Sequence, residues 1–264
     1  MAVTGRFTLA ADLRALGVPA GATVLVHSAL SRVRPGPGGP ATLLAALRDV
    51  LGDDGTVVVP TQTAGNSVTS RAFRAATAGL TPARAAAVEA AIEPFDPARS
   101  PAQGMGVFAE HVRRQAGARR SAHPQTSFAA LGPAAAALTA RHDLDCHLGD
   151  RSPLGALYAA DALVLLLGVD WSVCTAFHLA EYRCRRPAPR RAYRCYVRDP
   201  AGRRIRRDFQ APHLDDSDFP LIGAAVVAGG SVRCGPVGAA DGRRVRLRRA
   251  VDVAREWMDE HRLA

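Results

Sequence analysis

The sequence predicts a mixed α/β (α+β) fold, with a central sheet, flanking helices and an antiparallel hairpin in the C-terminal third. Three observations predict it. Apolar runs of strand length alternate with helical segments along the first two-thirds of the chain. A strand, a turn, a helix and a second strand follow one another over residues 22–60, an order that favours a parallel pair. Two extended runs joined by the turn 199–202 (DPAG) indicate the hairpin.

The strand predictions rest on short apolar or alternating runs bounded by turn residues. Residues 22–27 and 56–60 form the first pair, and residues 161–168 (DALVLLLG) form the most apolar strand of the chain. Further strands are expected in the C-terminal third, at 190–198, 203–210, 231–237 and 243–247.

The helix predictions rest on apolar positions at helical spacing and on residues that favour helix ends. Pro133 and Pro153 stand at first turns, where the missing N–H is tolerated. Thr175 is a favoured N-cap residue. The expected helices are, in chain order, 41–51, 83–92, 106–115, 133–142, 152–158, 175–183, 218–228 and 251–261.

Length and composition favour a single globular domain. The chain has 264 residues, of which 48% are hydrophobic, enough for a substantial core. We find no long linker and no fixed repeat, so residues 1–264 are predicted to form one domain. No apolar run approaches the roughly 18 residues of a membrane span, and the N-terminus lacks a signal-peptide pattern. The sequence therefore predicts a cytoplasmic protein with no membrane partner.

The charge is strongly basic and unevenly distributed. The formal net charge is +10, and all 34 basic residues are arginine, a bias typical of a GC-rich genome. Eleven arginines and one acid, Asp199, lie between Arg183 and Arg207. Such a surface attracts the phosphates of a nucleic acid or of a nucleotide cofactor. The alternative is a solvated, arginine-rich hairpin with no ligand.

Several common sites are excluded by spacing. The five cysteines form no C-x-x-C pair and are odd in number, which argues against a disulfide framework or a cysteine zinc site. There is no P-loop, and Gly104-Met-Gly106 lacks the remaining glycine of a dinucleotide fingerprint. No metal is predicted, because no third ligand joins the nearest candidate pair by spacing.

That candidate pair is His178 and Glu181, which follow the apolar strand 161–168. On a helix that starts at Thr175, His178 falls in the first turn and Glu181 lies on the same face. The positive end of the helix dipole favours the neutral imidazole, which can take up a proton. A carboxylate one turn away fixes the tautomer. The alternative is chance, because H-x-x-E is short and occurs on many surface helices.

Two further clusters carry polar side chains. Residues 27–32 (HSALSR) leave the first strand, and three glycines follow closely; hydroxyls, free N–H groups and an arginine there suit a phosphate or a pantetheine chain. In the second cluster, Pro124 holds His123 extended and Ser127 offers a hydroxyl to a polar ligand. The alternative for this second cluster is a structural turn.

The order of these blocks resembles one known family. The blocks are HSALSRV followed by GG, GTVVVPTQT, EPFDPARSPAQGMG, HPQTSFAALG, GDRSPLGALY, VLLLGV and T-x-x-HLAEYR, with F-x-x-IG at 219–223. The chain resembles the aminoglycoside N(3)-acetyltransferases, an antibiotic N-acetyltransferase type distinct from the GCN5-type enzymes. The resemblance covers about two-thirds of the chain.

The resemblance implies an acyltransferase that moves acetyl from acetyl-CoA to an amino group of an aminoglycoside, giving antibiotic resistance or self-protection. It implies that His178 is the general base, that Glu181 orients it and that Thr175 lies near the reacting centre. The residues implied to hold the pantetheine and phosphates of CoA, or to line the same cleft, are His27, Ser28, Ser31, Arg32, Gly104 and Ser127.

The acceptor side departs from the family pattern. Many relatives carry acids after the block that ends at Thr63, whereas residues 64–70 hold none, and the sequence pI is about 10.5. A cationic drug is repelled at long range by such a net charge. The acids expected to offset this are Glu93, Asp96, Asp170 and Asp218, with Asp143, Asp145, Asp215 and Asp216 as further candidates.

These departures leave other interpretations open. One is an N-acyltransferase for a less cationic amine in natural-product biosynthesis, and another is a non-catalytic CoA-binding protein. A nucleic-acid-binding module is disfavoured, because only Tyr193 and Tyr196 interleave the arginines. Cys174 beside the helix allows an acyl-cysteine route. The sequence also permits a homodimer.

Overall fold

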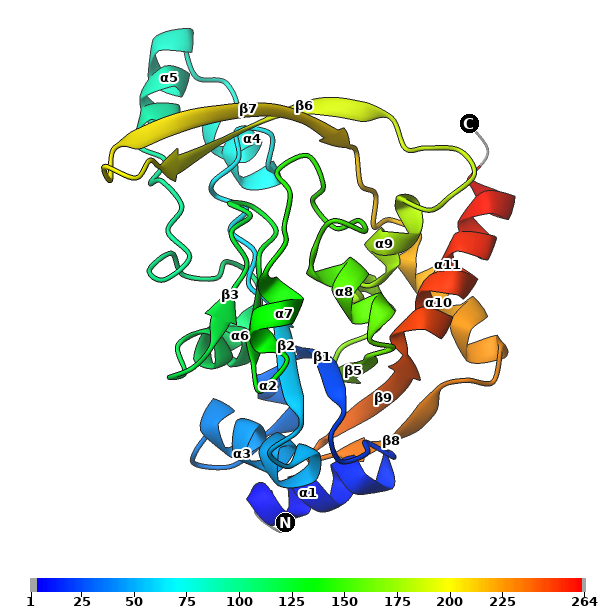
Figure 1. The fold of residues 1–264 in the computed structure, drawn as a ribbon. Helices are drawn as coiled ribbons and strands as arrows, with labels where there is room; N and C mark the ends of the chain where they lie inside the picture. The colour runs from blue at the N-terminus through cyan, green and yellow to red at the C-terminus, as the bar shows by residue number, and fades with distance from the viewer. Residues whose placement is uncertain (1–3, 263–264) are drawn as a thin grey trace.

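A mixed, 7-stranded sheet runs through the middle of the molecule, with strand order β3-β4-β2-β1-β5-β9-β8 (Figure 1). The computed structural model describes residues 4–262. The strands of this sheet are β1 (Thr23–Ser28), β2 (Thr56–Pro60), β3 (Arg119–Arg120), β4 (Phe128–Leu131), β5 (Leu163–Leu167), β8 (Arg233–Val237) and β9 (Ala240–Arg246).

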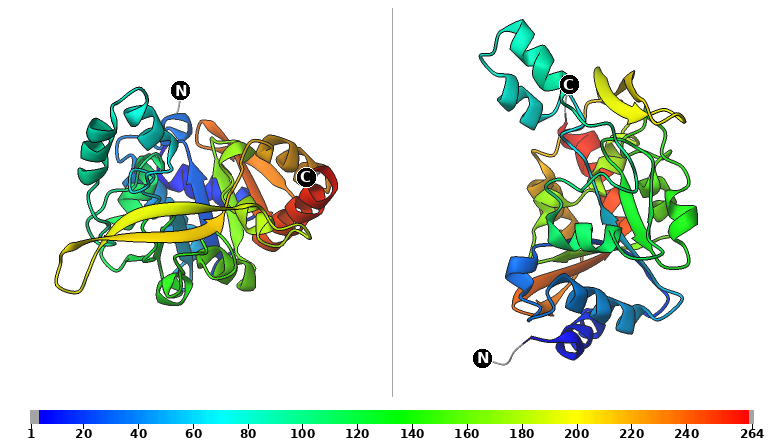
Figure 2. Two further views of the ribbon diagram at one scale, coloured as in Figure 1. Left: turned by 90° about the horizontal axis from the view of Figure 1, so that it is seen from above. Right: turned by 90° about the vertical axis from the view of Figure 1, so that its left-hand side faces the viewer.

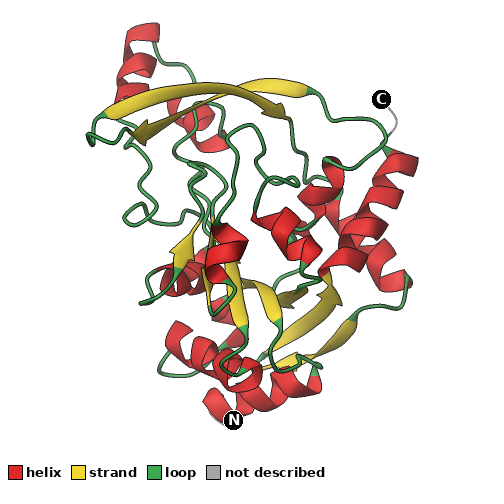
Figure 3. Cartoon of the chain, viewed as in Figure 1, coloured by secondary structure: helices red, strands yellow, loops and turns green. Residues whose placement is uncertain are grey.

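Helices cover both faces of the sheet (Figures 1 and 3). The first half of the chain holds α1 (Arg6–Ala15), α2 (Leu30–Val33), α3 (Pro40–Leu51), α4 (Arg71–Thr77), α5 (Pro82–Ala90) and α6 (Gly106–Arg113). The second half holds α7 (Ala135–Thr139), α8 (Pro153–Ala159), the 3₁₀ helix η1 (Trp171–Val173), α9 (Phe177–Glu181), α10 (Phe219–Ala228) and α11 (Leu247–His261). Within residues 4–262, no helix has both the length and the apolar character of a membrane span.

The centre of the sheet is parallel, as predicted. Strand β1 pairs in parallel with β2 on one side and with β5 on the other. All five residues of β2 and of β5 are buried, the pattern of strands covered on both faces. Alternate residues enter opposite cores, because successive side chains of a strand point to opposite faces. Leu25 lies in the core beneath α8, α10 and α11, whereas Val24 and Val26 lie in the core beneath α1, α3 and α6.

The predicted mixed α/β fold is confirmed. The expected strands, and most of the expected helices, match the observed elements within a few residues. The helix expected at 133–142 is a short one, α7. The helix expected at 175–183 is the single turn α9, which begins at Phe177. The sequence interpretation did not include α1, α2, α4, β3 and β4.

The predicted antiparallel hairpin forms a separate two-stranded sheet, β6 (Arg190–Arg198) and β7 (Arg204–Pro212). It crosses over one end of the molecule, near α4 and α5 (Figures 1 and 2). Tyr193 and Phe209 stack with ring centroids 5.5 Å apart, and His147 lies 4.5 Å from Tyr193. Arg194 forms ion pairs with Glu89 and Asp208. Part of the positive charge is therefore compensated within the protein.

Gly223 allows α10 to lie directly against Trp171 of η1. A methyl group at position 223 would overlap the Cβ and Cγ atoms of this tryptophan, and the overlap with Cβ persists in every rotamer. We expect Gly223→Ala to lower the free energy of unfolding by about 1–3 kcal/mol, measured by urea denaturation. Gly229→Ala is the control, because its methyl group would approach the flexible end of Arg249 at 3.2 Å and would meet the carbonyls of Val226 and Ala225 at ordinary contact distance. Equal stability of the two variants would contradict the close approach.

Candidate active site

The carboxyl ends of β1, β2 and β5 meet at one edge of the sheet, and a cavity of about 430 Å³ opens there. Ligands of open α/β sheets usually bind at this edge. The residues that border the cavity include Ser28 from the end of β1 and Pro60 from the end of β2. Two segments contribute five residues each. One is the segment after β5, with Val169, Ser172, Val173, Thr175 and His178, and the other lies within residues 104–109, at the start of α6.

A tight chain path leads from β5 to His178. Gly168 takes a positive φ of 70°, and Asp170 then caps η1 by accepting a hydrogen bond from the Ser172 N–H at 2.9 Å. Helix α9 has Ala176 at its N-cap, without a side-chain cap. The prediction that a helix starts at Thr175 is therefore wrong, because the backbone of Cys174 is not helical (φ −71°, ψ 86°) and i→i+3 bonds close the following turn. A helix of five residues has only a small dipole, so the dipole has little influence on His178.

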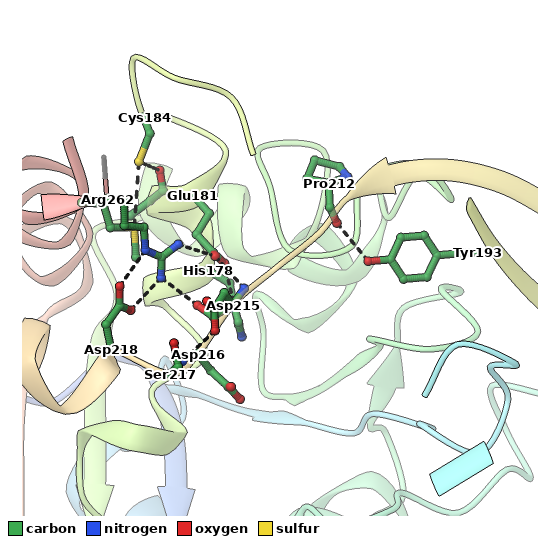
Figure 4. A network of polar contacts seen from close by, with 12 residues as sticks. His178, Glu181, Cys184, Tyr193, Pro212, Asp215, Asp216, Ser217, Asp218 and Arg262 are labelled. Atoms are coloured by element: carbon green, nitrogen blue, oxygen red, sulfur yellow. Dashed lines mark hydrogen bonds and ion pairs between the residues drawn. The ribbon is translucent and has the colours of Figure 1, made fainter. Parts of the chain in front are cut away.

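The predicted contact between His178 and Glu181 is present. The Nδ1 atom of His178 lies 2.6 Å from Oε2 of Glu181 (Figure 4). Residues three apart eclipse in a turn closed by i→i+3 bonds, so the pair forms without a longer helix. A carboxylate only accepts hydrogen bonds, which places the imidazole hydrogen on Nδ1. The Nε2 atom is then the one available to a molecule in the cavity.

The two side chains of this pair are shielded from solvent, Glu181 more fully than His178. The Glu181 side chain is 1% exposed and that of His178 is 15% exposed. The imidazole ring lies 4.7 Å from the Phe219 ring, centroid to centroid. The Oε1 atom of Glu181 accepts hydrogen bonds from the Asp215 N–H and from Arg262 (Figure 4). The carboxylate is therefore fixed at both oxygens.

Three of the residues expected to contact CoA border the same cavity, namely His27, Ser28 and Gly104. Burial lowers the pKa of His27 to about 4, and its Nε2 atom has no hydrogen-bond partner within the described chain. Gly104 has a positive φ of 71°, which glycine adopts at little cost. It precedes α6, whose first residues line the opposite wall.

Ser31 and Arg32 lie in an adjoining depression rather than in the cavity itself. The depression, of about 630 Å³, shares Val169 with the cavity. Arg34 and Arg243 also border it, together with Asp170 and Asp241. The guanidinium of Arg32 donates a hydrogen bond to the Gly168 carbonyl at 3.2 Å. Three arginines therefore surround a solvent-open hollow next to the cavity.

Ser127 is not at the cavity, which corrects the expectation that it lines the cleft. Its side chain is fully buried, and its hydroxyl donates to the Thr61 carbonyl at 2.9 Å while accepting from Arg120 at 3.0 Å. It directly precedes β4, which pairs with β2, so the chain encloses it. His123 is also buried, beneath the hairpin.

The four acids expected to bind the acceptor are dispersed. Glu93 borders a separate hollow. Asp96 caps a turn by accepting from the Ala98 N–H, and Asp170 caps η1 beside the arginines. Asp218 forms a two-point ion pair with Arg262. None of these four borders the cavity within the described chain, whereas Asp216 does.

Cys174 is unsuited to the acyl-cysteine route. Its side chain is fully buried, and burial raises the pKa of the thiol to about 12. A nucleophilic cysteine needs an accessible thiolate. The structure therefore assigns Cys174 to packing beside Trp171 and Phe177. In residues 4–262 no cluster of three or more His, Cys, Asp or Glu side chains could hold a metal ion.

Some site residues carried no usable signal in the sequence. Arg243 reaches the depression from β9, which pairs with β5 far along the chain. Ser172 and Met105 border the cavity from turns whose paths depend on tertiary packing. Asp216 stood among eight candidate acids, and only the fold singles it out.

Comparison with known proteins identifies the same relationship. A family model described as aminoglycoside 3-N-acetyltransferase matches residues 25–259. Aminoglycoside N(3)-acetyltransferase VII of Streptomyces paromomycinus is 38% identical over 272 residues, covering 97% of this chain and 91% of that protein.

Two solved structures are similar to this protein in three dimensions. The YokD protein from Bacillus subtilis is 30% identical with a TM-score of 0.92, covering 99% of this chain and 96% of that one. A structure described as AAC-IIIb binary with CoASH is 32% identical with a TM-score of 0.85, covering 97% of each chain. The extent of these matches and the order of the sequence blocks lead to one conclusion: the chain belongs to the aminoglycoside 3-N-acetyltransferase family.

Proposed function

We propose that the protein transfers the acetyl group of acetyl-CoA to an amino group of an aminoglycoside, and that this modification gives resistance or self-protection. One observation carries the proposal: His178, held by Glu181, borders the cavity at the carboxyl ends of the parallel strands. The family relationship supports the substrate classes, because its members are named for this reaction.

The residues present suit acetyl-CoA as the donor. The cavity beside His178, of about 430 Å³, has room for a thioester and the end of a pantetheine chain, with Ser28 on its wall. The adjoining hollow with Arg32, Arg34 and Arg243 suits phosphates, which arginine recognises well. A relative whose structure is described with CoASH supports this assignment. Because acetyl-CoA is supplied in the cytoplasm, the proposal places the reaction there.

In the proposed reaction, the amine nitrogen attacks the thioester carbonyl while Nε2 of His178 takes up the amine proton. The N–C bond forms and the C–S bond breaks. The imidazolium then returns the proton to the departing thiolate, so the products are an amide and the CoA thiol. Glu181 accepts the Nδ1 hydrogen and balances the transient positive charge. Thr175, on the cavity wall, is a candidate donor to the carbonyl oxygen.

Thiol release from acetyl-CoA tests this function. The wild-type protein is expected to release thiol when an aminoglycoside is present and to leave acetyl-CoA intact without one. A matched panel of neutral monoamines distinguishes the less cationic acceptor. Mass spectrometry of the product should show one added acetyl group. The proposal would be rejected if only the monoamines stimulated thiol release, or if none of the amines did.

Asp216 is expected to contribute to binding of the acceptor. Its side chain is 51% exposed and borders the cavity, and among the described residues its ion pair is with the highly exposed Arg71, at 3.7 Å. Removing one exposed charge costs little, so Asp216→Asn should raise KM for the aminoglycoside about two- to fivefold and leave KM for acetyl-CoA unchanged. The increase in KM for the aminoglycoside should be smaller at high salt, which screens the charge of Asp216. Glu256→Gln, on α11, is the control. An unchanged acceptor KM at low salt would exclude this role.

The homodimer stays a prediction that concerns assembly rather than chemistry. Sedimentation equilibrium of the purified protein measures it directly.

A further inference from the structure

Arg262, just beyond the end of α11, connects the His178–Glu181 pair to the loop that carries Asp216. Its Nη1 atom donates to Oε1 of Glu181 at 2.6 Å. Its Nε and Nη2 atoms both donate to the carboxylate of Asp218, each at 2.7 Å, and Nη2 also donates to the Asp215 carbonyl at 2.7 Å. Figure 4 shows the guanidinium among these three acceptors. Four of its five N–H donors are therefore engaged.

The contact with Glu181 provides a counter-charge that the carboxylate otherwise lacks. The Glu181 side chain is 1% exposed, and its other partners are an imidazole and a backbone N–H. A buried carboxylate is costly unless an opposite charge and hydrogen bonds compensate it. While His178 is neutral, as a base must be, Arg262 is the cation that touches Glu181.

The environment of Arg262 keeps its own charge. Burial acts to lower the pKa of its guanidinium, but hydrogen bonds to Asp218 and Glu181 outweigh that effect and raise the pKa above its ordinary value. The group is therefore positively charged at neutral pH. Its planar fork also fixes the direction of each donor, which an ammonium group does not do.

We infer that Arg262 is a positioning residue for the proposed acetyl transfer. It turns the Oε2 atom of Glu181 toward Nδ1 of His178, and it fixes the loop from Asp215 to Asp218 beside the cavity. The inference rests on the proposed function and extends it to a residue that does not touch substrate. A positioning residue that acts through Glu181 should change the rate of the chemical step more than the binding of acetyl-CoA.

Steady-state kinetics of Arg262→Ala tests this role. We expect kcat to fall about tenfold to a hundredfold, the size of effect that loss of an orienting partner produces. KM for acetyl-CoA should stay within about twofold, because no donor-binding contact is removed. Arg262→Lys should recover part of kcat, since it restores the charge without the fork. Millimolar guanidinium should also raise the rate of the alanine variant.

Arg255, on α11, is a matched control. Among the described residues its ion pair is with the exposed Glu256, at 3.6 Å, so Arg255→Ala should keep wild-type kcat. If Arg262→Ala does not fold, as judged by its near-ultraviolet circular dichroism, then Asp218→Asn replaces it. That variant leaves Arg262 in place but removes its two-point anchor, and should lower kcat about threefold to tenfold.

The outcomes separate this inference from the proposed function. A wild-type protein that releases no thiol with any aminoglycoside would overturn both. An active wild type beside an Arg262→Ala or Asp218→Asn variant with unchanged kcat would overturn the positioning role alone. A rise in KM for acetyl-CoA with unchanged kcat would do the same. Partial rescue by lysine or guanidinium supports the role, whereas a purely structural residue would show neither.

Discussion

Replacing His178 with alanine is expected to lower kcat for aminoglycoside acetylation by about a hundredfold to ten-thousandfold, the range that general-base catalysis contributes. The variant keeps the other residues that border the cavity, although it removes the imidazole ring that lies 4.7 Å from the Phe219 ring. What it loses is the nitrogen that would accept the amine proton while Glu181 holds the ring. KM for acetyl-CoA should therefore change little.

Initial rates of thiol release measure the effect, at saturating acetyl-CoA and over a range of acceptor concentrations. His111→Ala is the control, because that imidazole, on α6, does not border the cavity and its hydrogen-bond partner among the described residues is Gln115. The control should keep the wild-type rate. If His178→Ala also keeps it, the base is another group. His27, which borders the same cavity, would be the first to examine.

The His178–Glu181 pair could be predicted because its geometry is local. Side chains three residues apart meet in an α-helical turn and in a 3₁₀ turn alike. The contact between His178 and Glu181 therefore forms even though the helix begins at Phe177 and not at Thr175. The prediction of Thr175 as an N-cap residue failed because the bend at Cys174 is set by packing of η1 against α10. Local propensity has no information on that contact.

The sheet could be predicted for a similar reason. Buried parallel strands appear in the sequence as continuous apolar runs, and β2 and β5 are of this kind. By contrast, β4 is four residues rich in alanine, and β3 is a two-residue strand that exists only through its pairing with β4. The misplaced role of Ser127 follows from the same omission, since β4 is what buries that hydroxyl.

Residues that contact the pair from distant parts of the chain could not be predicted from the sequence. Asp215 and Arg262 contact Glu181 across 34 and 81 residues. In the sequence, Arg262 is one arginine among many near the C-terminus. Its role depends on the direction in which α11 leaves the sheet, which only the three-dimensional packing determines. A motif close in sequence can be predicted, whereas the residues that hold it in place mostly cannot.

The protein is expected to lose stability steeply between about pH 6.5 and about pH 5, because four histidines are held in neutral form. Burial lowers the pKa of His27 and that of His142 to about 4 and the pKa of His147 to about 3. It also drives the pKa of His123 well below its ordinary value. In the unfolded chain each titrates near about 6.5. Below that pH these histidines are protonated in the unfolded state but stay neutral in the native state, so unfolding becomes more favourable.

Each of these groups then costs up to about 1.4 kcal/mol of unfolding free energy per pH unit, or about 5.5 kcal/mol per unit for the four together. The loss begins as the pH falls through about 6.5 and continues until the native pKa is reached. Most carboxylates stay ionised in both states above about pH 5, so the histidines dominate this window. Urea denaturation at several pH values measures the slope.

A single substitution identifies the origin of the slope. The ring of His147 already lies against Tyr193 and Phe209, and its Nε2 atom has no hydrogen-bond partner among the described residues. In His147→Phe an aromatic ring of similar shape removes the titrating group, so the slope should decrease by about 1.4 kcal/mol per pH unit. His213→Gln, at an exposed site, should leave the slope unchanged. If His147→Phe also leaves it unchanged, acid destabilisation arises elsewhere, and the aromatic cluster beneath the hairpin does not sense pH.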